Sequence, residues 1–196
     1  MYEHPLQDAQ TFADIDAYPF ADPLDPARFT GLAERAHRIA HVEKKAVFLG
    51  SLCAGFLEMT AWTRGFENYF SDLAADQRLL TYLMDKFVDI KLAYWEKALA
   101  TVGDCVDAVN EADDFAGQYC MLFSPEMYRK LVKPRHKRIF DFIHSHSRAK
   151  IFFHSCGAIR PVIHDLIDAG VDILNPVQVS ARGMDSAELK REFGNE

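Results

Sequence analysis

The sequence predicts an α/β protein with about four parallel strands and intervening helices, which corresponds to a partial TIM barrel or to a small doubly wound sheet. Two observations lead to this prediction. Short apolar runs alternate with longer amphipathic segments, and apolar residues recur in those segments at helical spacing. The chain has 196 residues, of which 49% are hydrophobic and 26% charged, as is ordinary for a globular protein. We therefore expect a single domain over residues 1–196, an incomplete barrel around one core.

Charge and hydropathy argue against several kinds of partner. Lys and Arg number 22 against 29 Asp and Glu, and the resulting net charge of -7 opposes binding to phosphates or anionic lipids. No apolar segment approaches the roughly 20 residues that span a bilayer, and the first residues lack the pattern of a signal peptide. We expect a cytoplasmic protein that binds neither nucleic acid nor membrane.

The predicted strands are four short apolar runs, each bounded by Gly or polar residues. They cover residues 46–49, 105–109, 150–153 and 171–174. The predicted helices begin at good capping residues or follow an apolar stripe. They cover residues 26–45 behind Asp25, 54–70, 72–100, a segment from Ser124 that Pro134 should bend, a segment from Ile159 that ends before Gly170, and 185–193.

Polar residues follow three of these strands. Because ligands of parallel α/β folds bind at the carboxyl ends of the strands, we expect these side chains to converge on one face. They are Glu111, Asp113, Asp114, His154, Cys156, Asn175 and Gln178.

His154 and Cys156 form the sharpest chemical pattern. Residues i and i+2 of a strand point the same way, so the imidazole and the thiolate could bind one metal, and zinc suits such ligands. A buried cysteine beside a capping or core histidine is the alternative. Cys53, Cys105 and Cys120 are expected to be small buried side chains, with Cys120 kept as a distant candidate ligand.

The acidic cluster also allows two interpretations. Glu111, Asp113 and Asp114 form either a solvated loop or a functional group in which crowded carboxylates have raised pKa values and act as general acids. His144 and His146 do not share a helix face, so a surface or C-cap location is expected. The two tryptophans, Trp62 and Trp95, and the 15 phenylalanines are expected in the core.

The segment Phe153-His154-Ser155-Cys156-Gly157, with the run 165–178 that follows it, closely resembles the uroporphyrinogen decarboxylase superfamily. Further motifs extend the resemblance over almost the whole chain. They are Gly65-Phe66-Glu67-Asn68, Asp113-Asp114-Phe115-Ala116-Gly117-Gln118, Ser124-Pro125-Glu126, Lys133-Pro134-Arg135 and Gly183-Met184-Asp185.

This resemblance implies a TIM barrel and either of two activities. The methyltransferases of the superfamily use zinc held by His-x-Cys and a later Cys, whereas the decarboxylases need no cofactor. When this zinc motif is matched to the present sequence, the resemblance implies that His154 and Cys156 are the first two zinc ligands. The third ligand would lie on a later strand, so the resemblance also implies that the chain is a piece of a longer enzyme.

The function expected first is zinc-dependent methyl transfer between a corrinoid protein and a thiol or pterin. Asp113 and Asp114 are the candidate catalytic residues, and Glu111, Asn175 and Gln178 the candidate contacts to a small-molecule substrate. The alternatives are porphyrinogen decarboxylation and a non-catalytic partial barrel that binds a ligand or dimerises.

A half-barrel would expose strand edges and one face of its sheet, so we expect a homo-oligomer. Its interface should include residues 47–49 or 171–174, which would face the missing part of a barrel.

Overall fold

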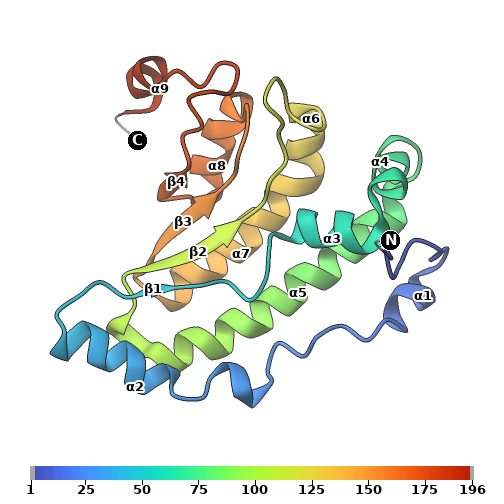
Figure 1. Cartoon of the computed structure of the whole chain (residues 1–196). Helices are drawn as coiled ribbons and strands as arrows, with labels where there is room; N and C mark the ends of the chain where they lie inside the picture. The colour runs from blue at the N-terminus through green and yellow to red at the C-terminus, as the bar shows by residue number, and fades with distance from the viewer. Residues whose placement is uncertain (1–2, 195–196) are drawn as a thin grey trace.

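The computed structural model describes residues 3–194 and folds them around a four-stranded sheet (Figure 1). All strand pairs are parallel, and the order is β1-β2-β3-β4. The strands are β1 Phe48–Leu49, β2 Ala108–Ala112, β3 Lys150–His154 and β4 Ile173–Asn175. A spatial order that follows the chain is the order of a barrel wall, whereas a doubly wound sheet reverses direction at an inner strand. The fold is therefore α/β with the arrangement of a partial TIM barrel.

Helices connect successive strands. The α-helices are α1 Phe12–Asp16, α2 Leu32–His37, α3 Phe56–Arg64, α4 Phe66–Ala74, α5 Gln77–Val102, α6 Pro125–Met127, α7 Lys133–His146, α8 Ile163–Ala169 and α9 Ser186–Phe193. Short 3-10 turns cover η1 Pro26–Arg28, η3 Gly103–Cys105 and η5 Arg160–Val162, and π-helical turns cover η2 Arg38–Val42 and η4 Tyr128–Val132. Within residues 3–194, no helix combines the length and the apolar composition needed to cross a membrane.

The two faces of the sheet differ in burial. One face packs against α7, which lies between α5 and α8. On this face Phe153 of β3 is fully buried, with its ring 5.6 Å from that of Phe140 on α7. The opposite face carries Phe48, which is 53% exposed and lies edge-on to Phe152 at 5.2 Å between ring centroids, and Ile173, which is 42% exposed. Helices thus cover the outer side of the wall, and its inner side remains open.

Several helix boundaries differ from the predicted ones. The expected helix over 54–70 is two helices, α3 and α4, because Gly65 adopts φ 82° and ψ 138°, a conformation that ends the first helix and that side chains with a Cβ rarely adopt. The expected helix over 26–45 is replaced by η1, α2 and η2, although Asp25 accepts from the Ala27 N–H as predicted. Ser124 also caps as predicted, and the π-helical turn η4 interrupts the helix just before Pro134.

The second strand lies three residues later than predicted, and this shift changes the surroundings of the acidic cluster. Residues 103–105 form a 3-10 turn, and the Asp107 carboxylate accepts from the Val47 N–H at 2.8 Å, so pairing with β1 begins at Ala108. Glu111 consequently lies inside β2, on its buried face, instead of following the strand.

Several burial predictions are wrong. Some phenylalanines expected in the core are exposed, namely Phe12, Phe48, Phe66 and Phe70. Trp95 on α5 is fully buried, but Trp62 on α3 is 47% exposed. Cys120 is exposed on the loop after β2, while the other two cysteines expected in the core, Cys53 and Cys105, are half-buried.

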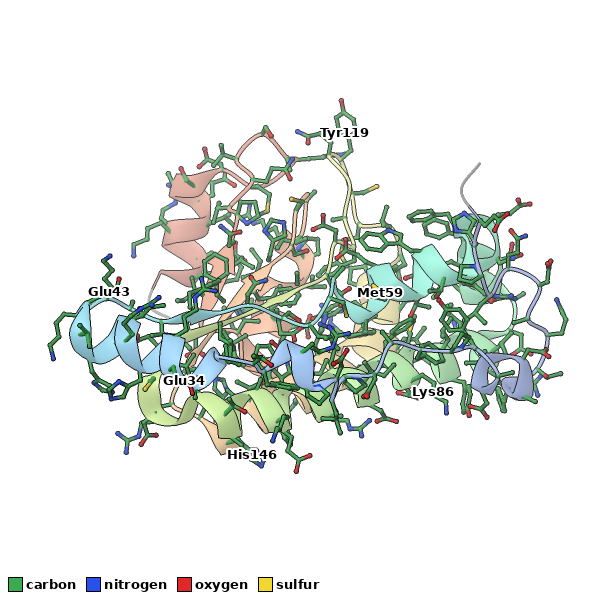
Figure 2. All side chains as sticks on the ribbon, turned by 60° about the horizontal axis from the view of Figure 1, so that its bottom comes forward. Glu34, Glu43, Met59, Lys86, Tyr119 and His146 are labelled. Atoms are coloured by element: carbon green, nitrogen blue, oxygen red, sulfur yellow. The ribbon has the colours of Figure 1, made fainter. Side chains whose placement is uncertain are left out.

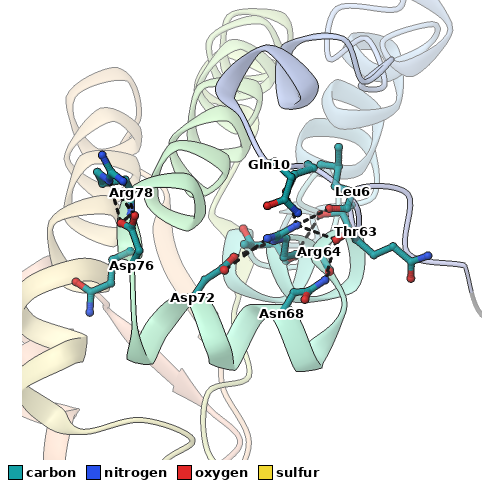
Figure 3. A network of polar contacts seen from close by, with 12 residues as sticks. Leu6, Gln10, Thr63, Arg64, Asn68, Asp72, Asp76 and Arg78 are labelled. Atoms are coloured by element: carbon teal, nitrogen blue, oxygen red, sulfur yellow. Dashed lines mark hydrogen bonds and ion pairs between the residues drawn. The ribbon is translucent and has the colours of Figure 1, made fainter.

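The Arg64 side chain anchors the N-terminal segment (Figure 3). It is 6% exposed and lies at the end of α3. Its Nη1 donates to three carbonyl oxygens at 2.9, 3.0 and 2.9 Å, those of Leu6, Gln7 and Ala9. Its Nε donates to Asp72 of α4 at 2.8 Å. One guanidinium therefore joins residues 6–9 to both helices.

We predict that Arg64→Lys lowers the free energy of unfolding by about 2–4 kcal/mol, because an ammonium cannot reproduce the planar fork and leaves buried carbonyls without donors. Urea denaturation measures this change. Arg78→Lys is the matched control, since Arg78 pairs with Asp76 at a side-chain exposure of 82% and should leave the midpoint unchanged. An unchanged midpoint for Arg64→Lys would contradict the anchoring role.

Candidate metal centre

The carboxyl ends of β2, β3 and β4 bring polar residues from three loops together. His154 is the last residue of β3 and lies in register between Ala112 of β2 and Asn175 of β4. Asp114 follows two residues after Ala112, and Cys156 two residues after His154. Parallel pairing in this register places the loops that carry Asp114 and Cys156 side by side.

Three potential ligand atoms converge here. The His154 Nε2 lies 3.4 Å from the Cys156 Sγ and 3.9 Å from the Asp114 Oδ1. One ligand atom from each residue lies within 4.8 Å of the other two. The side chains of His154 and Asp114 are 38% and 42% exposed, so the group is open to solvent. This confirms that His154 and Cys156 face the same side, while their role as metal ligands stays a prediction.

The side chain of Asn175 favours one tautomer of His154. Its Oδ1 lies 2.7 Å from the His154 Nδ1, and an amide oxygen can only accept, so in this arrangement Nδ1 carries the proton. The lone pair of Nε2 is then directed toward Cys156, which is the arrangement that metal-binding histidines use. Asn175 was expected to contact substrate; in the structure it contacts His154, a candidate metal ligand.

A tight turn after β3 holds Cys156. Gly157 has φ 92°, and a Cβ on it would lie 2.5 Å from the Ala116 carbonyl oxygen, so only glycine fits. The Gln178 Oε1 accepts from the Gly157 N–H at 2.7 Å, and its Nε2 donates to Gln118 at 2.9 Å. Gln178, also expected to bind substrate, thus fixes this turn to the loop after β2.

Asp114 links the loops and contributes negative charge. Its Oδ1 accepts from the Cys156 N–H at 2.7 Å. Partial burial, together with the nearby carboxylates of Asp114 and Glu58, raises the pKa of the Cys156 thiol. A cation bound at this point would oppose that effect by stabilising the thiolate.

Asp113 lies next to Asp114 in sequence but points into the core. It is 1% exposed, and burial raises its pKa. Its Oδ1 accepts from the Leu57 and Glu58 N–H groups at 2.9 and 3.2 Å, and its Oδ2 lies 2.9 Å from the His136 Nε2 of α7. Asp113 therefore caps α3 and contacts α7, and the interpretation of this stretch as a solvated loop is wrong at this residue.

Glu111 is also buried, at 2% exposure, on the helix-covered face. It accepts from the Lys91 Nζ at 2.9 Å and from the Trp95 Nε1 at 2.6 Å, both on α5. The solvated-loop interpretation is therefore wrong here too. The side chain of Glu111 contacts α5 between the sheet and the helices, and it does not reach the group formed by Asp114, His154 and Cys156.

Glu58, in the first turn of α3, is a site residue that the sequence analysis did not identify. Its carboxylate accepts from the Gly55 N–H at 3.4 Å, and burial followed by the nearby Asp113 and Asp114 raises its pKa. The Gly55-x-x-Glu58 spacing resembles a capping pattern and is the one signal that could have marked it.

Other sequence candidates lie elsewhere. Cys120 does not belong to the potential metal-binding group found among the described residues. It lies on the loop beside Tyr119, which is 76% exposed and projects from the molecule (Figure 2). His144 pairs with Asp172 at 2.8 Å beside the start of β3, where Asp172 also accepts from the Ile151 N–H. His146 is at the exposed end of α7, as expected.

Comparisons with known proteins identify the family of the chain and a similar fold. No curated protein sequence matches the chain significantly. A methyltransferase from Methanosarcina mazei has a similar structure, with a TM-score of 0.57 and 20% sequence identity over 75% of this chain. The similarity covers 41% of that methyltransferase chain, so the match spans less than half of its length. The family model described as uroporphyrinogen decarboxylase (URO-D) matches residues 4–185. Because that match covers most of the sequence, the chain belongs to the uroporphyrinogen decarboxylase family.

Proposed function

We propose that Asp114, His154 and Cys156 hold a zinc ion, and that the site serves methyl transfer between a corrinoid protein and a thiol or pterin. The observation that carries this proposal is the approach of an imidazole, a thiol and a carboxylate within 4.8 Å at the carboxyl ends of parallel strands. Active sites of TIM barrels lie at this end.

The donor set and its spacing fit zinc. Bonds of roughly 2.0 Å to nitrogen and 2.3 Å to sulfur at tetrahedral angles separate the two donor atoms by about 3.5 Å. The His154 Nε2 and Cys156 Sγ are 3.4 Å apart. Catalytic zinc sites use three protein ligands and an open fourth position. Asp114 is the third donor that this chain itself supplies, although the family resemblance implies a later cysteine.

The residues around the site prepare it for this role. Asn175 keeps the His154 Nε2 free to ligate, and Gly157 and Gln178 hold Cys156 beside it. When bound, zinc supplies the Lewis acidity that lowers the pKa of a coordinated acceptor thiol and makes it a nucleophile. The exposure of Asp114 and His154, 42% and 38%, leaves room for a small acceptor. A corrinoid protein is the proposed partner. We also propose a cytoplasmic location, where the four free cysteines would stay reduced.

We predict that the purified chain binds zinc and that Cys156→Ser and Asp114→Asn each remove most of it, as measured by elemental analysis. Asn175→Ala should retain the ligands but weaken zinc affinity about 10–100-fold in a chelator competition, because it releases the orientation of His154. Cys120→Ser, which alters an exposed cysteine outside the group, is the control and should keep full zinc content. Stoichiometric zinc in a His154→Ala/Cys156→Ser double variant would show that the metal binds elsewhere.

Decarboxylation of a porphyrinogen is the alternative function, and the exposed carboxylate of Asp114 at the mouth favours it. In that reaction the carboxylate would hold pyrrole N–H groups, and no metal would be needed. Activity that survives complete chelation would support decarboxylation, whereas activity that depends on zinc would support methyl transfer. A third possibility is a non-catalytic partial barrel, which a folded protein inactive in both assays would support.

We also propose that the open face of the sheet mediates homo-oligomer formation. β1 and β4 are edge strands, and Phe48 and Ile173 on them are 53% and 42% exposed. Apolar residues next to β4 extend this surface; they are Val177, 42% exposed, and Val179, 63% exposed. Open edges and apolar faces favour association with another chain.

We predict a dimer or larger oligomer at micromolar concentration in light scattering, with an interface above roughly 1,200–2,000 Å². Phe48→Asp and Ile173→Asp should shift it toward monomer, because a carboxylate would be buried without a partner. Val42→Asp, at a residue that is 72% exposed in η2, should leave the assembly unchanged. A stable wild-type monomer that does not bind a hydrophobic dye would refute this proposal.

A further inference from the structure

A small cavity lies beside the candidate metal centre, between α3, α4 and the loop after β2. Its volume is about 180 Å³. At roughly 30 Å³ per water molecule, this space matches a ligand of a few heavy atoms and is far too small for a tetrapyrrole. Glu58, Trp62, Phe66, Tyr69, Asp114 and Leu122 are among its lining residues. Asp114 borders both the cavity and the metal centre, so a ligand here would lie next to the candidate zinc ligands.

Aromatic side chains form much of the cavity wall. Trp62 and Phe66 are 47% and 49% exposed, and among residues 3–194 no other aromatic ring pairs with Trp62. Tyr69 is 3% exposed, and its hydroxyl has no hydrogen-bond partner in the described part of the chain. The hydroxyl is not among the fully buried side-chain atoms that lack a partner in residues 3–194, so it is accessible, and Tyr69 lines the cavity, where this hydroxyl can contact a ligand.

The charge of the cavity is negative. Glu58 and Asp114 line it, and among the described residues no Lys, Arg or His does. Each carboxylate has a backbone donor, since Glu58 accepts from the Gly55 N–H at 3.4 Å and Asp114 from the Cys156 N–H at 2.7 Å. Among residues 3–194 neither carboxylate pairs with a Lys or an Arg, and the His154 Nε2 lies 3.9 Å from the Asp114 Oδ1. An anionic ligand would be repelled from this space.

We propose that this cavity binds a small organic cation that carries methyl groups on nitrogen, of the quaternary-ammonium class. Aromatic faces attract such a cation through their quadrupoles, and its methyl groups suit a largely apolar wall. The two carboxylates balance a charge that cannot be hydrogen-bonded. The proposal goes beyond the proposed function and assigns the cation no role as methyl donor or acceptor; the cavity and the metal centre share only Asp114. Binding itself requires neither metal nor turnover.

Choline is the probe, and 3,3-dimethylbutan-1-ol, in which carbon replaces the nitrogen, is its neutral counterpart. Titration calorimetry or saturation-transfer NMR on the full chain, with a chelator present, measures both affinities. We expect choline to bind about tenfold more tightly than the neutral compound. Trp62→Ala and Phe66→Ala should each weaken choline binding about three- to thirty-fold, and Glu58→Gln should weaken choline without weakening the neutral compound.

Matched controls alter similar residues outside the cavity. Tyr119→Ala removes an aromatic ring that is 76% exposed on a neighbouring loop, and Glu67→Gln removes an exposed carboxylate of α4; both should leave choline affinity unchanged. Circular dichroism checks that each variant is folded. Equal affinity for the two compounds, absence of choline binding, or unchanged binding in Trp62→Ala and Phe66→Ala would overturn the proposal. Because zinc is removed throughout, a failure here is distinct from a failure of the zinc site.

Discussion

The carboxylate of Asp113 joins three parts of this fold next to the candidate metal centre. It accepts from two N–H groups at the start of α3 and contacts His136 of α7, so it fixes the loop after β2 to two helices at once. In an extended chain, neighbouring side chains point to opposite sides. With Asp113 held in the core, Asp114 must face outward, toward His154 and Cys156. The open donor group thus depends on a buried carboxylate that takes no part in it.

The sequence allowed the wall of the barrel and the His154–Cys156 pair to be predicted, because both follow from local patterns. Apolar runs mark strands, and spacing of two within an extended segment puts side chains on one face. The surroundings of Glu111 and Asp113 could not be predicted, since their partners are distant in sequence: Lys91 of α5 for Glu111, and the start of α3 with His136 for Asp113. A three-residue shift of β2 was enough to move Glu111 from a supposed loop to the core.

Two acidic environments with opposite character lie close together in this molecule. Glu111 is neutralised by Lys91 at 2.9 Å, with both side chains almost fully buried, so this charge is balanced within the fold. Asp114 and Glu58 have backbone donors but no such cation, and the cavity that they border is lined by aromatic rings. The Glu111–Lys91 pair links β2 to α5 within the fold. The second environment leaves the negative charge of two carboxylates without a balancing Lys or Arg among residues 3–194, and both proposed ligands, the metal ion and the organic cation, carry the opposite charge.

Residues 4–9 contact both helices that form the wall of the cavity, α3 and α4. The His4 Nδ1 lies 2.7 Å from the Trp62 carbonyl oxygen, and the Leu6 N–H donates to the Thr63 carbonyl, so this segment runs along the end of α3 that carries the exposed indole. Arg64 then ties the same segment to α4, which supplies Phe66 and Tyr69. The N-terminal segment therefore acts as a brace across the α3–α4 junction. None of residues 4–9 lines the cavity, so this segment supports the helices of its wall from outside.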